Sequence, residues 1–133
     1  MTQNLFHKTS FNHPPPDVIG ELNILTKLSA AYKIWHEYLT NLPRHTRFTI
    51  GAKIDNLFTD CLELSLFLGY APKEQKFSIL IKLSAKFDSL KFFLKLLWEI
   101  KAIDNKKYNH LSIPFSEIGK MIGKWLKTFK NSE

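Results

Sequence analysis

Apolar residues recur along the chain at intervals of three and four positions, the spacing that places side chains on one face of a helix. Four segments carry this pattern, and no stretch alternates apolar and polar residues for long enough to predict a strand. The first predicted helix covers residues 18–39, with Asp17 as its N-cap, and the second covers residues 43–68. The third covers residues 73–102 and the fourth residues 111–129. The sequence therefore predicts an all-α fold.

Prolines and glycines mark the ends of these segments. Pro43 fits the first turn of the second helix, because the amide that proline lacks has no intrahelical partner there. Gly69 is the predicted C′ residue after that helix, and Pro72 prevents its continuation. Pro114 falls in the first turn of the fourth helix. These positions predict short connections between the helices.

Four helices with short connections favour one antiparallel up-down-up-down four-helix bundle, which we assign to residues 18–133. A chain of 133 residues is long enough to bury its own core without disulfides or metals. Residues 1–17 end in a polar, proline-rich stretch that offers little to bury, and we predict that they form a flexible tail.

The third helix has two apolar sides. One stripe is predicted to face the core and consists of Ile79, Leu83, Phe87, Leu90, Leu94 and Leu97. At about 100° per residue, Ile81, Phe92 and Leu96 fall on roughly the opposite side. Because four helices cannot fully surround one of their number, we interpret the second side as an interface of a homo-oligomer. The alternative is that these three are scattered exposed residues.

The fourth helix has one narrow apolar stripe, which consists of Phe115, Ile118, Ile122, Trp125 and Phe129. Its opposite side carries the lysines Lys120, Lys124 and Lys127. Gly119 and Gly123 leave a flat strip on the flank, and each costs about 1 kcal/mol relative to alanine in a helix interior. We expect another helix to approach closely at this strip.

The formal net charge of +7 is unevenly distributed. Charges cancel over residues 1–42, so the whole excess lies beyond Pro43 and favours a polyanionic partner, either nucleic acid or an acidic protein surface. Arg44 and Arg47 stand at the start of the second helix, where free amides and the helix dipole also attract phosphate. The candidate nucleic-acid contacts are Arg44, Arg47, Lys53, Lys120, Lys124 and Lys127. Alternatively, these cations only keep the surface solvated.

Residues with catalytic or metal-binding potential are poorly arranged. The five histidines show no pairing at positions i and i+4, and no cysteine accompanies them. The segment from Gly119 to Trp125 resembles a phosphate-binding loop only superficially, because three residues separate its glycines and Trp125 replaces the hydroxyl residue. We therefore expect no enzymatic activity, no cofactor and no metal.

A single cysteine and the lack of long apolar runs indicate the compartment. Cys61 lies on the apolar face of the second helix and cannot form an intramolecular disulfide, which fits a reducing environment. The N-terminus has no apolar region of signal-peptide length, and no run approaches the roughly 18 apolar residues that span a bilayer. We expect a cytoplasmic protein without membrane association.

Several motifs together point to a family. They are Trp35 in the first helix, the set Pro43, Arg44, Arg47, Thr49 and Gly51, and the C-terminal set Ile118, Gly119, Met121, Ile122, Gly123 and Trp125. Over residues 18–130 the chain resembles the accessory variability determinant proteins of diversity-generating retroelements. These proteins form part of a wider four-helix-bundle group that includes proteins encoded in intervening sequences of bacterial ribosomal RNA genes. Lys124 stands where the family often has another glycine.

The resemblance implies a homopentameric barrel with a basic surface and a central channel. It also implies a non-catalytic partner that binds RNA or DNA and a reverse transcriptase, and so supports mutagenic copying of a template RNA. Arg44 and Arg47 become the first candidates for those contacts. Two alternatives stay open: an orphan bundle of the ribosomal intervening-sequence type, and a structural assembly protein with no nucleic-acid role.

Overall fold

The helices of the chain follow the predicted order. The computed structural model describes residues 16–131, with side chains from residue 23 onward. Its helices are α2 (Pro16–Thr40), α3 (Arg44–Thr46), the π-helical turn η1 (Arg47–Gly51), α4 (Ala52–Tyr70), α5 (Lys73–Glu99) and α6 (Asn105–Asn131). Across this described range there is no strand, which confirms the all-α prediction. The predicted tail lies outside the described residues as far as residue 15. Pro16 and Asp17 belong to α2, so the helix begins two residues earlier than predicted and Asp17 is not its N-cap.

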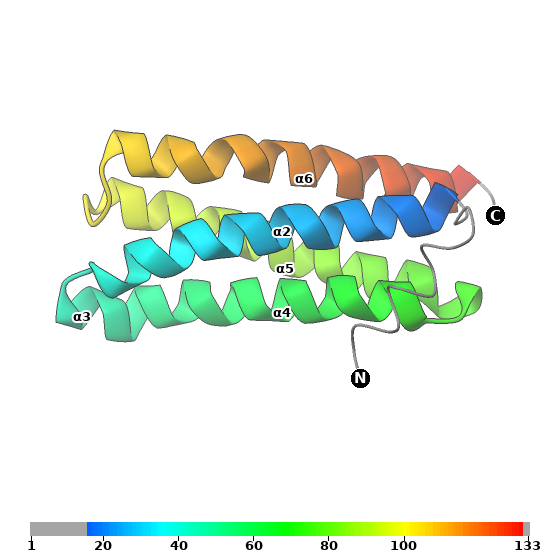
Figure 1. Cartoon of the computed structure of the whole chain (residues 1–133), viewed down its shortest axis with the longest axis horizontal. Helices are drawn as coiled ribbons and strands as arrows, with labels where there is room; N and C mark the ends of the chain where they lie inside the picture. The colour runs from blue at the N-terminus through cyan, green and yellow to red at the C-terminus, as the bar shows by residue number, and fades with distance from the viewer. Residues whose placement is uncertain (1–15, 132–133) are drawn as a thin grey trace.

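The four long helices form an antiparallel bundle (Figure 1). Helix α2 packs against α4 and α6, and α5 packs against the same two helices. In the described residues no Cα atoms of α4 and α6 come within 8 Å, so these two helices are diagonal. The connection at residues 41–43 and the turn at residues 100–104 lie at one end of the bundle, next to α3 (Figure 1). We call this end the α3 end.

Each long helix contributes one aromatic ring to the middle of the core. Trp35 of α2 stacks on Phe58 of α4 with ring centroids 6.4 Å apart. Phe115 of α6 meets Phe58 edge-on at 5.5 Å and lies 5.3 Å from Phe87 of α5. All four rings are buried, and such pairs add about 0.5–1.5 kcal/mol each beyond the apolar area they bury. This chain of contacts connects all four long helices through the core and uses three of the 11 phenylalanines of the sequence.

The predicted apolar stripes face this core with small shifts. Leu83, Phe87, Leu90, Leu94 and Leu97 of α5 are buried, whereas Ile79 is half-buried and Leu80 takes its place. Phe115, Ile118 and Ile122 of α6 are buried, while Trp125 and Phe129 near its end are half-buried. The helical periodicity therefore identified the buried side of each helix correctly.

The start of the fourth helix was predicted wrongly. Helix α6 begins at Asn105 rather than at residue 111, and Pro114 lies inside it. Asp104 is the N-cap, since its Oδ1 accepts a hydrogen bond from the Lys107 amide at 2.8 Å. A proline inside a helix costs about 3 kcal/mol, because it removes one backbone hydrogen bond and crowds the preceding turn. Burial of Leu111 and Phe115 on either side of Pro114 offsets this cost.

Gly69 does not end the second helix as predicted. No glycine in the described residues has a positive φ, and α4 continues through Gly69 to Tyr70. The helix ends because Ala71 takes an extended conformation with ψ of 144°. Steric contact with the ring of Pro72 disfavours helical geometry at the residue before it.

Helix α5 ends at Glu99, three residues before the predicted end, and a lysine occupies its left-handed cap. Lys101 has a φ of 66°. Its amide donates to the Trp98 carbonyl at 2.9 Å, and the Ala102 amide donates to the Leu97 carbonyl at 3.1 Å. This is the Schellman pattern, in which glycine is the usual residue because it adopts a positive φ without steric cost.

The glycines of α6 do not mediate a close helix contact within the chain. A Cβ atom built on Gly119 would lie 3.6 Å from Phe87 Cε2, an ordinary contact distance, and one built on Gly123 would meet nothing within 4 Å. The expected approach of another helix is therefore absent within one chain.

We predict that Gly123→Ala raises the free energy of unfolding by about 0.5–1 kcal/mol in urea titrations, because alanine restricts the unfolded chain and favours the helix. Gly51→Ala is the matched control and should be destabilising, since its Cβ would lie 3.1 Å from both Leu39 Cδ1 and the Thr46 carbonyl oxygen. A loss of stability or a changed native mass for Gly123→Ala would show instead that another subunit packs on the strip.

Cys61 is fully buried on the core face of α4. Burial, reinforced by the negative charge of Asp60, raises its pKa from 9.0 to about 12. The unfolded chain therefore loses the thiol proton at a lower pH than the folded chain. The contribution of the protonated thiol to stability is complete below pH 9 and is lost as the pH rises toward 12.

We predict that Cys61 lowers the free energy of unfolding by about 1.4 kcal/mol between about pH 8 and pH 10. Urea titrations at both pH values measure the decrease in the free energy of unfolding from pH 8 to pH 10. This decrease should be about 1.4 kcal/mol smaller for Cys61→Ala than for the unmodified protein, because the variant has no thiol to ionise. Equal losses for the two proteins would contradict the prediction.

Candidate nucleic-acid interface

The connection between α2 and α4 contains one unusually wide helical turn. The predicted second helix is interrupted at η1, where the hydrogen bonds are those of a π-helix. Thr49 Oγ1 donates to the His45 carbonyl at 2.9 Å and competes with the regular backbone bonds of this turn. Single π-helical turns inside α-helices are frequent at functional sites. The turn changes the angular register of the residues before it, which periodicity alone could not predict.

Gly51 allows α2 to pack directly against this turn. It is buried, and an added Cβ would lie 3.1 Å from Leu39 Cδ1 and 3.2 Å from Leu42 Cδ1. A larger residue would therefore force these side chains, or the Thr46 carbonyl oxygen at 3.1 Å, to shift by a few tenths of an ångström. The sequence indicated Gly51 only through the family motif, and the structure provides the physical reason.

Asp55, one helical turn after Gly51, connects α4 to α2 through hydrogen bonds. Its Oδ1 accepts hydrogen bonds from the Tyr32 hydroxyl at 2.9 Å and from Trp35 Nε1 at 3.2 Å. Burial raises the pKa of Tyr32, and the hydrogen bond and negative charge of Asp55 raise it further. Sequence reasoning missed Asp55, because a single carboxylate on a helix carries no recognisable signal. This contact and Gly51 hold the turn that carries the candidate arginines.

Arg44 and Arg47 differ in their surroundings. Arg44 is exposed, as expected of a residue that contacts a partner. Arg47 is half-buried, and its Nη1 donates to the Thr40 carbonyl at 3.4 Å. Among the described residues its Nε is buried without a hydrogen-bond partner. Arg47 therefore also supports the connection from α2, whereas Arg44 is free to bind a ligand.

Phe48 lies beside both arginines and is 66% exposed. The guanidinium carbons of Arg44 and Arg47 lie 5.7 and 5.6 Å from its ring centroid, within cation–π distance. Sequence reasoning missed this residue. The available signal was that Phe48 falls outside the helically spaced apolar series of the second predicted helix, which consists of Ile50, Ile54, Leu57, Phe58, Cys61, Leu64 and Leu68. We call Arg44, Arg47 and Phe48 the arginine turn.

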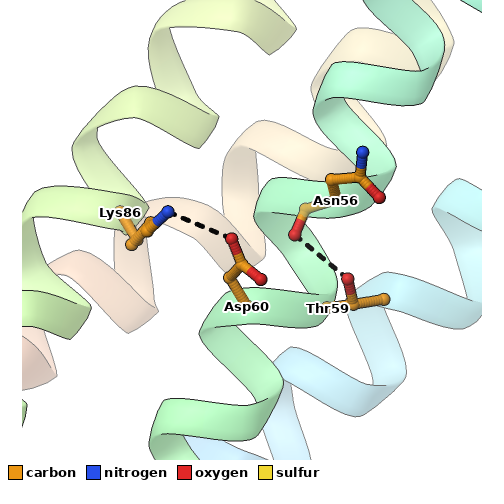
Figure 2. A network of polar contacts seen from close by, with 4 residues as sticks. All are labelled: Asn56, Thr59, Asp60 and Lys86. Atoms are coloured by element: carbon orange, nitrogen blue, oxygen red, sulfur yellow. Dashed lines mark hydrogen bonds and ion pairs between the residues drawn. The ribbon is translucent and has the colours of Figure 1, made fainter.

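Lys53 lies in a different environment. Its Nζ is 5.9 Å from the Phe93 ring centroid, and it lines a groove of about 540 Å³ between α4 and α5. The groove also contains Asp60 and Lys86, which form an ion pair across it at 3.1 Å (Figure 2). The surroundings of Lys53 therefore carry both signs of charge.

The candidate lysines of α6 are separate from the arginine turn. Lys120, Lys124 and Lys127 are exposed, as predicted. They belong to the C-terminal half of α6, the helix diagonal to α4. This half of α6 runs toward the end of the bundle opposite the α3 end (Figure 1). The structure thus separates the six candidates into the two arginines, Lys53 in the groove and the three lysines of α6, and does not bring them together within one chain.

Other cations join the arginine turn at the α3 end. Lys101 and Lys106 are exposed in and after the turn between α5 and α6. Lys107 lies 5.5 Å from the centroid of the Tyr38 ring, and the Tyr38 hydroxyl lies 3.0 Å from His110 Nδ1. Burial raises the pKa of Tyr38, with a further contribution from Asp104 and Glu37. Sequence reasoning missed these cations because only the fold brings the two connections to one end.

The candidate interface residues of α5 lie on the outer side of the bundle. Ile81 is 47% exposed and Phe92 is 61% exposed, while Leu96 is half-buried. Ile81 and Phe92 are about three helical turns apart and therefore point in nearly the same direction. Helix α5 thus presents a second apolar face that the protomer does not cover.

The part of the chain that the structure describes contains no candidate metal centre. Its histidine, cysteine and carboxylate side chains form no group of three that could hold a metal ion. Within the same part, no helix has the length and apolar character needed to cross a membrane.

Comparison with known families assigns the chain to a family. A family model described as bAvd-like matches residues 22–129. The chain belongs to the bAvd-like family. Members of this family are accessory proteins. The match includes the arginine turn, the second apolar face of α5 and the lysines of α6. A search of curated proteins finds no match.

Proposed function

We propose that this bAvd-like protein is a non-catalytic accessory subunit of a diversity-generating retroelement. In this role it binds nucleic acid and a reverse transcriptase, and supports mutagenic copying of a template RNA. The observation that carries the proposal is the family match over residues 22–129. We further propose that the protein acts in the reducing cytoplasm, because the single thiol of Cys61 is buried and forms no disulfide.

Surface charge supports the nucleic-acid part of the proposal. The net charge is +7, and the exposed Arg44, Lys101 and Lys106 converge at the α3 end with the half-buried Arg47. Cations in such an arrangement contact phosphates and position a nucleic acid without reading its sequence. Lys53 and the α6 group Lys120, Lys124 and Lys127 provide further contacts if the ligand extends around the bundle or across several protomers.

The uncovered face of α5 supports assembly, for which we propose a homopentamer. Ile81, Phe92 and Leu96 belong to α5, which also forms one wall of the groove between α4 and α5. The groove carries Lys82 and Lys86 as well as Asp60 and Glu63, so its charges can pair with those of an identical surface. We therefore propose that a second copy of the chain binds to this side of α5.

We predict that Arg44→Glu weakens binding to a structured RNA and to a DNA duplex about tenfold at about 50 mM salt, and lowers the slope of log affinity against log salt by about one. Fluorescence anisotropy of the full-length protein measures both quantities. Arg44 is chosen over Arg47 because its exposed side chain can be changed without loss of a buried contact.

The control is Lys33→Glu, which makes the same charge change at an exposed position of α2. Equal weakening by Arg44→Glu and Lys33→Glu would mean that binding depends on total charge and not on the arginine turn. Weakening only by the combined Lys120→Glu, Lys124→Glu and Lys127→Glu variant would move the interface to α6. Undetectable binding by the unmodified protein would refute the nucleic-acid role.

We predict that Phe92→Asp dissociates the oligomer with little change in helicity, because a carboxylate cannot be buried in an apolar interface without a partner. Native mass spectrometry and circular dichroism measure the two effects. Ile113→Asp is the matched control, since Ile113 is 63% exposed but lies on α6. An unchanged native mass for Phe92→Asp would place the interface elsewhere, and a monomeric unmodified protein would refute assembly altogether.

A further inference from the structure

Phe48 exposes more of its surface than any other large apolar residue in the described part of the chain, at 66%. Full burial of a phenylalanine side chain stabilises the folded state by about 1.5–3 kcal/mol, and the exposed ring of Phe48 lacks most of this stabilisation. Phe48 lies in η1, next to the exposed Arg44 and the half-buried Arg47. These facts indicate a ligand with an aromatic or apolar surface and a negative charge.

The two arginines leave most of this ring accessible. Their guanidinium carbons lie 5.7 and 5.6 Å from its centroid, but the exposed fraction shows that they do not enclose the ring. Arg44 is exposed, and neither arginine takes part in the ion pairs found among the described residues. A ligand at this ring therefore meets an open aromatic surface and two positive charges at once.

The arginine turn is held rigidly before any ligand binds. The Arg47 amide donates to the Pro43 carbonyl at 2.8 Å, and the Arg47 side chain reaches the Thr40 carbonyl. Gly51 is buried against Leu39 and Leu42 directly beneath the turn. The backbone of the turn therefore loses little conformational entropy on binding, which favours affinity.

An unpaired nucleotide matches these features better than a base pair inside a duplex. In a duplex the faces of the bases are already stacked, and a side chain on the outside reaches mainly phosphates and groove edges. In a single strand the base face is free to stack on an aromatic ring, while the adjacent phosphates pair with arginines. An apolar protein surface fits less well, because it would have to desolvate both guanidinium groups.

We propose that the arginine turn is a stacking site for an unpaired nucleobase, with Phe48 as the platform and Arg44 and Arg47 as the phosphate contacts. The α3 end of the bundle then binds single-stranded segments in preference to duplexes. This proposal rests on the proposed nucleic-acid role and adds the form of nucleic acid that the site accepts.

The test compares the full-length protein with Phe48→Leu, which keeps an apolar side chain but removes the aromatic ring. Fluorescence anisotropy measures the affinity for labelled oligouridylate of about 20 nucleotides and for an RNA duplex of equal length, both at about 50 mM salt. We expect Phe48→Leu to weaken single-strand binding about 5- to 100-fold and to change duplex binding less than about twofold.

Two further variants make the result specific. Phe48→Trp should retain single-strand affinity, and its added indole fluorescence should be quenched by oligouridylate beyond the change seen with the unmodified protein. Phe67→Leu changes another exposed phenylalanine, which is 45% exposed on α4, and should alter neither affinity. Thermal unfolding of each variant confirms that the fold is intact.

The outcomes separate this proposal from the one on which it rests. If the unmodified protein binds both probes but Phe48→Leu weakens both equally or neither, the stacking site is refuted while nucleic-acid binding stands. If Phe48→Leu changes the native mass, the ring lies between copies of the chain and the stacking site is refuted. If the unmodified protein binds neither probe, both proposals fail.

Discussion

The close contact between the end of α2 and the start of α4 determines the geometry of the rest of the α3 end. Gly51 permits this contact, since any Cβ there would lie 3.1 Å from Leu39 Cδ1. One turn later, the carboxylate of Asp55 accepts hydrogen bonds from Tyr32 and Trp35 of α2. Leaving such polar groups without a partner on burial would cost about 1–3 kcal/mol, so the two helices are held in one register. The arginine turn is presented from this fixed base.

Several local features of the fold oppose ordinary helix preferences. Helix α6 contains Pro114, the cap of α5 is Lys101 with a φ of 66°, and η1 replaces regular α-helix. The buried ring contacts that connect all four long helices compensate for these costs. Lys101 and η1 lie at the α3 end, so that the less favourable backbone geometry coincides with the proposed binding region. Strained conformations concentrate at functional sites in many proteins.

The two proposed interfaces occupy different parts of the molecule and use different chemistry. The arginine turn combines cations with one exposed ring, as a surface that binds single-stranded nucleic acid requires. The outer face of α5 is apolar at Ile81 and Phe92 and is bordered by a groove with both signs of charge, as an interface between identical chains requires. A homo-oligomer would repeat the arginine turn in every subunit.

The sequence by itself determined the four helices, their buried sides and the family, because helical periodicity and local motifs depend on residues close together in the chain. It also indicated Arg44 as exposed and Phe92 as lying away from the core. The tertiary structure alone decided that α4 and α6 are diagonal, so that Lys120, Lys124 and Lys127 are separated from the arginines. It also revealed the wide turn η1, the role of Asp55 and the exposure of Phe48. The helix arrangement and the role of Asp55 depend on contacts between residues far apart in the sequence, for which the local pattern contains no signal. For Phe48 the local pattern offered only its place outside the apolar series of the second helix.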